Sequence, residues 1–258
     1  CAEQPFFSFD DWFIGSTKVP RGVTNEAKRL TKKFHYNDIE SLKKQIIKFK
    51  NRIACVVLEP SSTECPKINK NISNCCNKAV CDRNFKKENH FLKQVEKLCK
   101  KNNIVFVLDE MITGFRWHLK GAQHFYGVKP DISTFGKAMA NGFSVSAICG
   151  KKKIMELGSI TNTKQERVFL LSTTHGAEMN GLSAFIETVR FLKKNRVIKH
   201  NWDYGSKLIK ESNRISEKIG IQDYFSFAGI ACSPFFTCLD NNKKNSLEFR
   251  TLFIQEML

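Results

Sequence analysis

One lysine is distinguished by its surroundings in the sequence. Lys137 is the only lysine between Lys129 and Lys151, and no other residue from 132 to 150 carries a charge. Apolar surroundings disfavour the ammonium form of a lysine and lower its pKa, and the free amine can then attack a carbonyl and form a Schiff base. The neighbouring Gly136 leaves room for a ring or a backbone to approach closely. We therefore expect Lys137 to lie in an apolar pocket and to act as a nucleophile.

Two acidic residues follow runs of apolar residues that read as buried strands. Asp109 follows the run at 104–108, and Glu59 follows the run at 53–58. In open α/β sheets, ligands bind outside the carboxyl ends of the strands. An acid at such an end either faces a ligand or caps the next turn, and a nucleophilic lysine nearby in the sequence favours the first role for Asp109.

A nucleophilic lysine and a buried carboxylate together meet two needs of pyridoxal phosphate. The pyridine ring acts as an electron sink when its nitrogen stays protonated, and Asp109 is the candidate carboxylate that holds this proton. The third need is a phosphate site, which hydroxyls and amides at a helix start can provide. Residues 172–176 precede an expected helix at 177–194 and supply hydroxyls, although capping of that helix is an equally simple role for them.

Several short motifs in the chain resemble the class III aminotransferases, and within them the glutamate-1-semialdehyde 2,1-aminomutase group and its aminotransferase relatives. The matching segments are Asp109 to Arg116, Gly121 to Gln123, Pro130 to Ile132, Gly136 to Ala138, Asn141 to Gly142, and Leu170 to Glu178. Ile112 stands where many class III members have a glutamine that contacts the ring hydroxyl, which agrees with the aminomutase side of the family.

The resemblance implies a fold type I pyridoxal-phosphate enzyme that works as a homodimer, with its active site at the subunit interface. Lys137 then forms the Schiff base and Asp109 partners the pyridine nitrogen. Thr174 touches the phosphate of the neighbouring subunit's cofactor, and Glu59 lies near the site. The implied activity is amino-group transfer between small amino and oxo substrates, and the alternative within the class is a true glutamate-1-semialdehyde aminomutase of tetrapyrrole synthesis.

The elements that must position these residues alternate between strands and helices. Apolar faces predict a helix near 39–46, another near 91–99 and a third at 177–194, and they flank the strand-like runs. We expect an α/β fold with a mostly parallel sheet and flanking helices. Residues 1–198 are expected to form an incomplete cofactor-binding large domain with an insertion-like loop at 61–87. Residues 199–258 are expected to begin a small α+β domain, so that the chain is a central fragment of a longer enzyme.

The composition argues against nucleic-acid binding, metal binding and membrane insertion. The formal charge is +17, but the lysines are spread over nearly every predicted helix without a nucleic-acid-binding signature. We therefore expect no nucleic-acid partner. Two interpretations compete with the enzyme: an inactive truncated remnant, and a basic module that binds nucleic acid. The ten cysteines show no zinc-site spacing, so no metal is expected. The chain has no stretch of 18 apolar residues, so we expect no membrane span. We expect a cytoplasmic protein. Targeting to an organelle stays open, because the chain starts at a cysteine and not at a methionine.

Overall fold

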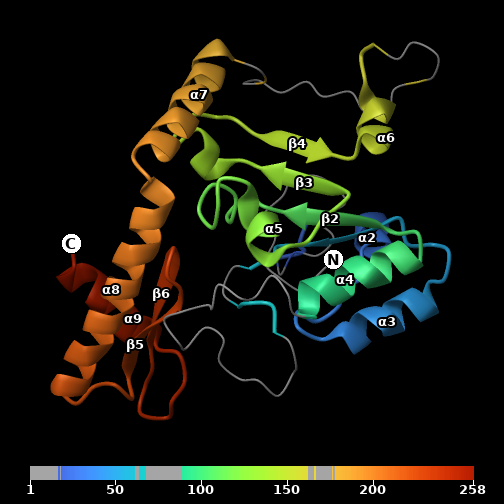
Figure 1. The fold of residues 1–258 in the computed structure, drawn as a ribbon. Helices are drawn as coiled ribbons and strands as arrows, with labels where there is room; N and C mark the ends of the chain where they lie inside the picture. Colours follow the sequence, from blue (N-terminus) through green and yellow to red (C-terminus); the bar gives the residue numbers. More distant parts are fainter. Residues whose placement is uncertain are drawn as a thin grey trace.

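The computed structural model describes residues 17, 19–61, 64–67, 89–161, 166, 176 and 178–258. Most of the insertion-like loop predicted at 61–87 therefore lies outside the described residues. Figure 1 shows a central sheet with helices packed in front of it and a long pair of helices along one side, next to a separate hairpin. The α/β architecture predicted from the sequence is confirmed, and the mostly parallel sheet is confirmed with it.

The central sheet has four strands in the order β1-β2-β3-β4. The first three strands are parallel to one another, and β4 pairs with β3 in the antiparallel direction. The strands are β1 (Cys55–Leu58), β2 (Val105–Asp109), β3 (Ile132–Phe135) and β4 (Ala147–Gly150). Because β1, β2 and β3 run the same way, their carboxyl ends meet at one edge of the sheet.

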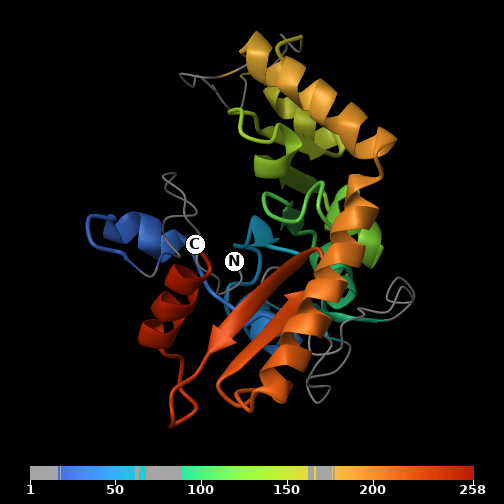
Figure 2. The same ribbon diagram turned by 90° about the vertical axis from the view of Figure 1, so that its left-hand side faces the viewer.

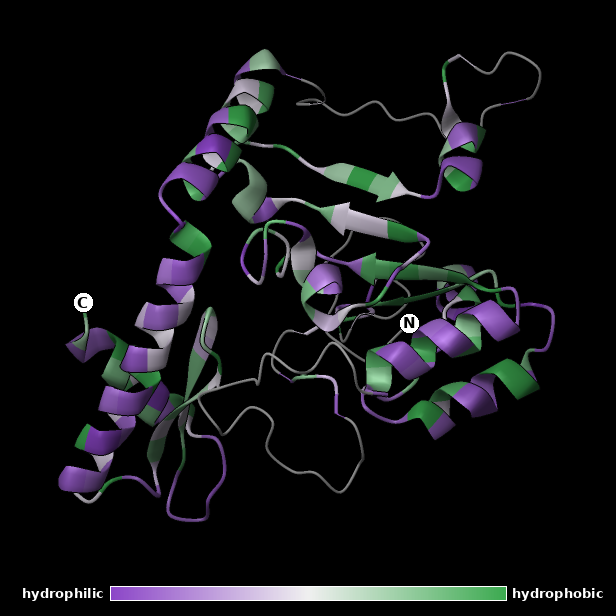
Figure 3. Ribbon diagram, in the orientation of Figure 1, coloured by the Kyte–Doolittle hydropathy of each residue, from purple (hydrophilic) through white to green (hydrophobic). Residues whose placement is uncertain are grey.

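The two faces of the sheet carry different sets of side chains, because successive residues of a strand point to opposite faces. On one face, Val56, Leu58, Phe106 and Leu108 pack into the main core. The helices that cover this core are α3 (Ile39–Lys48), α4 (Phe91–Lys101) and α5 (Gly121–Tyr126). Figure 3 shows hydrophilic and hydrophobic residues alternating along both α3 and α4. The other face of the sheet holds a smaller apolar cluster around Val57 and Val107. Residues 105, 107 and 109 of β2 point to this face, and Asp109 is the last of them.

Local capping residues begin the first helices. The hydroxyl of Thr24 accepts a hydrogen bond from the backbone of α2 (Asn25–Leu30), and the carboxylate of Asp38 accepts two from the first turn of α3. Such caps satisfy backbone N–H groups that have no partner inside the helix.

Beyond β4, the chain forms the short helix α6 (Lys152–Met155) and the 3₁₀ turn η3 (Glu156–Gly158).

The C-terminal part consists of two long helices, a hairpin and a last helix, which Figure 2 shows from the side. These elements are α7 (Met179–Lys194), α8 (Val197–Lys218), β5 (Phe225–Ile230), β6 (Ser233–Cys238) and α9 (Leu247–Glu256). Arg196 adopts a left-handed conformation (φ 51°) between α7 and α8 and separates the two helices.

The C-terminal elements share contacts with the main core. The indole N–H of Trp202 in α8 donates a hydrogen bond of 3.2 Å to the carbonyl of Trp117, and its ring stacks on Phe125. Ile230 at the end of β5 is buried in the same core cluster. The division into domains at 198 and 199 stays a prediction. Across the described residues, no helix combines the length and the apolar character that a membrane span needs.

Candidate functional site

Lys137 lies just beyond the carboxyl end of β3, where the 3₁₀ turn η2 (Lys137–Met139) begins. Its backbone is left-handed (φ 46°), and the extended Gly136 before it lies so close to Met111 that a Cβ there would be 2.4 Å from the methionine Cε. The side chain of Lys137 is exposed. The burial expected for this amine is therefore not found among the described residues, because its apolar neighbours Met139 and Ala140 are buried while the lysine turns outward.

Asp109 is the last residue of β2 and is half-buried. Its Oδ1 atom accepts two hydrogen bonds, one of 2.9 Å from the backbone N–H of Met111 and one of 3.2 Å from the hydroxyl of Thr134. Within the described part of the chain, the Oδ2 atom of Asp109 accepts no hydrogen bond. A half-buried carboxylate with one oxygen occupied and one open is suited to accept a hydrogen bond from a protonated ring nitrogen.

Glu59 follows β1 directly and lies at the same edge of the sheet as Asp109. The register pairs Leu58 with Leu108, so the residues that follow these two, Glu59 and Asp109, are neighbours along the edge. Glu59 is half-buried. Thr134 lies opposite Asp109 on the next strand. The tertiary structure thus brings two of the predicted site residues together at the carboxyl end of the parallel strands, the position at which ligands bind in such sheets.

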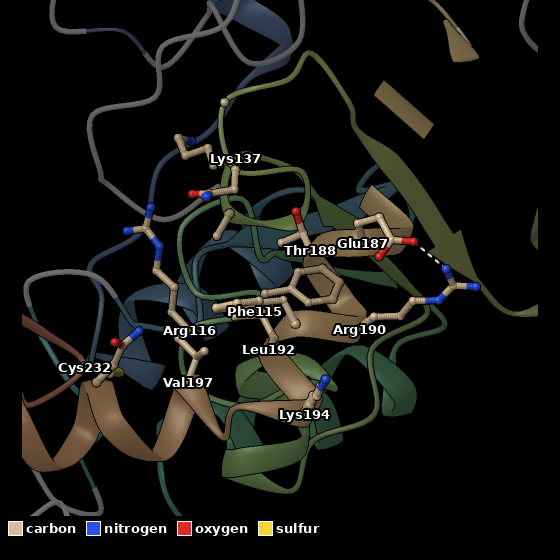
Figure 4. Close-up of a pocket in the computed structure, with 15 residues that line it drawn as sticks. Phe115, Arg116, Lys137, Glu187, Thr188, Arg190, Leu192, Lys194, Val197 and Cys232 are labelled. Atoms are coloured by element: carbon tan, nitrogen blue, oxygen red, sulfur yellow. Dashed lines mark hydrogen bonds and ion pairs between the residues drawn. The ribbon is translucent and has the colours of Figure 1, made fainter. Parts of the chain in front are cut away.

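A pocket with a volume of about 1200 Å³ has Lys137 among its lining residues. Figure 4 shows Lys137 and Arg116 at one rim of this pocket, with the ion pair of Glu187 and Arg190 at the other side. The rest of the lining is Phe115, Ala138, Asn141, Gly142, Thr188, Phe191, Leu192, Lys194, Val197, Asn201 and Cys232. Neither Asp109 nor Glu59 lines the pocket, so the described residues do not enclose the lysine and the two acids in one cavity.

Thr174, the residue expected at the phosphate, lies outside the described residues. The phosphate role of Thr174 therefore stays a prediction. The chain is described again from residue 178, where Glu178 is the extended residue just before α7.

Glu110 is a structural residue that the sequence reasoning missed. Its side chain is fully buried, and its carboxylate accepts hydrogen bonds from the hydroxyl of Thr113 and the backbone N–H groups of Ala122 and Gln123. Burial raises the pKa of the Glu110 carboxyl above its ordinary value, and these hydrogen bonds act in the opposite direction. The carboxylate holds the start of α5 against the end of β2, which fixes the backbone next to Asp109. A signal for this role is Gly121, where a Cβ would be 2.5 Å from the glutamate oxygen.

Comparison with known proteins identifies the relatives of this chain. The 3-aminobutyryl-CoA aminotransferase of Cloacimonas acidaminovorans is 27% identical over 100% of this chain and 56% of its own length. The glutamate-1-semialdehyde 2,1-aminomutase of Nitrosopumilus maritimus is 31% identical over 91% of this chain and 52% of its own length. The chain spans about half the length of the curated relatives that it matches.

Solved structures share the fold of this chain. The FumI protein of Sphingopyxis sp. MTA144, in its PLP internal aldimine form, superposes with a TM-score of 0.73 at 20% identity, over 93% of this chain and 51% of that one. An omega-transaminase from Sphaerobacter thermophilus gives a TM-score of 0.73 at 18% identity, over 96% and 56% of the two chains. The sequence profile of the family described as Aminotransferase class-III matches residues 84–228, more than half of the chain. The strand ends that carry Asp109 and Lys137 lie within that match, and the chain belongs to the class-III aminotransferase family.

Proposed function

We propose that this protein is a pyridoxal-phosphate enzyme that transfers an amino group between small amino and oxo compounds. The observation that carries the proposal is the open Oδ2 atom of Asp109 at the carboxyl end of β2, one strand from the turn that begins with Lys137. Membership of the class-III family supports it, and relatives of this chain carry the names of aminotransferases and aminomutases.

The residues at the sheet edge fit pyridoxal phosphate. Asp109 offers an acceptor oxygen for the ring nitrogen, and Lys137 has no ion pair or hydrogen bond with any described residue that would compete for its amine. We assign the phosphate to Thr174 of the neighbouring subunit and a supporting position to Glu59. When bound, the cofactor supplies an electron-poor ring that stabilises negative charge on the substrate carbon next to the amino group.

The protein's own residues perform three tasks in this proposal. Lys137 would hold the cofactor through Nζ, and its amine would be free for proton transfer when an amino substrate is bound. The amine of Lys137 would take the proton from the substrate carbon that bears nitrogen, as a general base, and would deliver it as a general acid to the cofactor carbon that the lysine had held, not back to the first carbon. Asp109 holds the proton on the ring nitrogen throughout, because a carboxylate within hydrogen-bonding distance favours the protonated form.

The exposure of Lys137 requires a cover for the site, and we propose that a second subunit supplies it. The face around the site supports a homodimer, because several apolar side chains there are uncovered. Phe143 is 52% exposed, Ile148 in β4 is 56% exposed, and Ile186 in α7 is 48% exposed. An apolar cover would exclude water from the site and from the groups that react there.

Borohydride trapping tests the proposal directly. The intact protein is incubated with pyridoxal phosphate, reduced with sodium borohydride, digested and mapped by mass spectrometry. We expect the reduced cofactor adduct on Lys137, its loss in Lys137→Ala, and its full retention in Lys153→Ala, which removes an exposed lysine elsewhere. An adduct on another lysine, or no adduct in the intact protein, contradicts the proposal.

A second assay separates the two members of the class. With glutamate-1-semialdehyde as the only substrate, an aminomutase returns the amino group to the neighbouring carbon of the same molecule. An aminotransferase instead requires a second oxo substrate for turnover. The aminomutase names among the relatives motivate this choice of test substrate.

A further inference from the structure

The carboxylate of Asp109 is held from two sides through a single oxygen. The backbone N–H of Met111 and the hydroxyl of Thr134 both donate to Oδ1, at 2.9 Å and 3.2 Å. The first donor follows Asp109 along the chain, and the second comes from the neighbouring strand. A rotation of the carboxylate about its last bond would break both hydrogen bonds, so together they fix its plane.

Thr134 is itself held firmly at the sheet edge. It lies directly opposite Asp109 in the parallel pairing of β2 and β3, and its carbonyl accepts a hydrogen bond of 2.9 Å from the backbone N–H of Glu110. Its branched Cβ restricts the side chain to few rotamers. Glu110, in turn, is fixed by the start of α5. The hydroxyl of Thr134 is therefore a preorganised donor and not a chance contact of a mobile side chain.

We propose that Thr134 is a positioning residue that aims the open Oδ2 atom of Asp109 at the cofactor ring nitrogen. The inference rests on the proposed function, because it assigns the ring nitrogen to Asp109. Thr134 and Met111 both donate to Oδ1. Among the described residues no group donates to Oδ2, which is therefore open to the N–H of the ring. Its hydroxyl acts through Asp109 and touches no reacting atom.

A purely structural role for Thr134 makes a different prediction. As a cross-strand pair at a sheet edge, the threonine would contribute to folding stability alone. Its removal would then leave the affinity for the cofactor and the protonation of the bound ring unchanged. The two roles are separated by measurements on the bound cofactor and not by activity alone.

The test compares three variants of the intact protein with the wild type. Thr134→Val removes the hydroxyl and keeps the shape, and Thr134→Ser keeps the hydroxyl. Ser133→Ala is the matched control, because the hydroxyl of Ser133 is next in sequence but bonds Gln123 on the other face of the strand. The dissociation constant of pyridoxal phosphate is measured by absorbance titration, and the absorption bands of the bound cofactor are followed from acid to alkaline pH.

We expect Thr134→Val to weaken cofactor binding about 10-fold, the size of one lost hydrogen bond to a charged group. The pH at which the bound cofactor changes its absorption should shift in the same variant. Thr134→Ser should restore both properties, and Ser133→Ala should leave both at the wild-type value. A Thr134→Val variant with wild-type affinity and pH profile overturns the inference, and so does a Thr134→Ser variant that behaves like it.

The failure of the inference is distinguishable from a failure of the proposed function. If the wild type forms no borohydride adduct on Lys137, the proposed function fails. If the wild type and Thr134→Val both form the adduct with equal affinity, only the role of Thr134 is refuted. Should Thr134→Val prove too unstable to purify, Thr134→Cys, which replaces the hydroxyl with a weak donor, takes its place under the same criteria.

Discussion

Replacement of Glu110 with alanine tests the interpretation that a buried carboxylate holds α5 against the end of β2. The wild-type side chain is fully buried and accepts three hydrogen bonds of 2.6 Å, 2.7 Å and 2.7 Å, from Thr113, Ala122 and Gln123. Two of the donors are backbone N–H groups at the start of a helix, which have no partner within the helix itself. The alanine variant leaves both of these donors without an acceptor.

The expected loss follows from these contacts. A buried N–H group without a partner costs about 1–3 kcal/mol, and the donor of Ala122 is buried while that of Gln123 is only partly so. We therefore expect Glu110→Ala to reduce the free energy of unfolding by about 2–4 kcal/mol. The variant no longer buries a carboxylate, and this saving in desolvation free energy offsets part of the loss from the two unpaired N–H groups.

Urea unfolding of the intact protein, followed by circular dichroism at constant pH, measures the effect. Thr113→Val is the matched control, because it removes the hydroxyl donor and keeps both backbone hydrogen bonds to Glu110. It should cost about 1 kcal/mol. The reasoning is refuted if Glu110→Ala stays within about 1 kcal/mol of the wild type, or if Thr113→Val costs as much as Glu110→Ala.

Three further predictions concern stability and thiol reactivity. Because burial raises the pKa of Glu110, the folded protein keeps a proton that the unfolded protein releases, so stability should fall as the pH rises above the ordinary value of 4.5. Urea titrations across this range should show a weaker slope in Glu110→Gln, and an unchanged slope contradicts the assignment. Gly205→Ala should cost about 1–3 kcal/mol or more in thermal unfolding, since its Cβ would lie 1.7 Å from a backbone carbonyl oxygen, whereas Gly158→Ala, with open space around it, should cost little. Burial raises the pKa of the Cys232 thiol to about 12, so iodoacetamide at pH 8 followed by peptide mapping should label the exposed Cys149 and spare Cys232; faster labelling of Cys232 would contradict this.

The sequence predicted the elements of the large domain because their signals are local. The apolar run at 104–108 predicted the strand that the structure gives as β2, shifted by one residue at each end. The helix predicted near 39–46 corresponds to α3, which begins at Ile39 and ends two residues later than predicted. The helix predicted at 177–194 corresponds to α7, and its apolar face is only partly covered, since Leu182 and Ile186 are exposed.

The candidate site was predictable in part. The positions of Asp109 and Glu59 at strand ends follow from apolar runs that stop at an acid, and parallel pairing brings the two together. The exposure of Lys137 was not predicted. Its neighbours in sequence are apolar, but the left-handed turn at the end of β3 directs the lysine outward, and only packing against other chain segments could decide its exposure.

The sequence by itself determined which residue types end the strands and thus which chemistry the sheet edge can support. The tertiary structure alone decided how those residues are held. The pairing of Asp109 with Thr134 joins residues 25 positions apart, and the bonds of Glu110 reach 12 and 13 positions along the chain. Such contacts depend on strand register and on how a helix packs against a sheet, and no local pattern of residues encodes them.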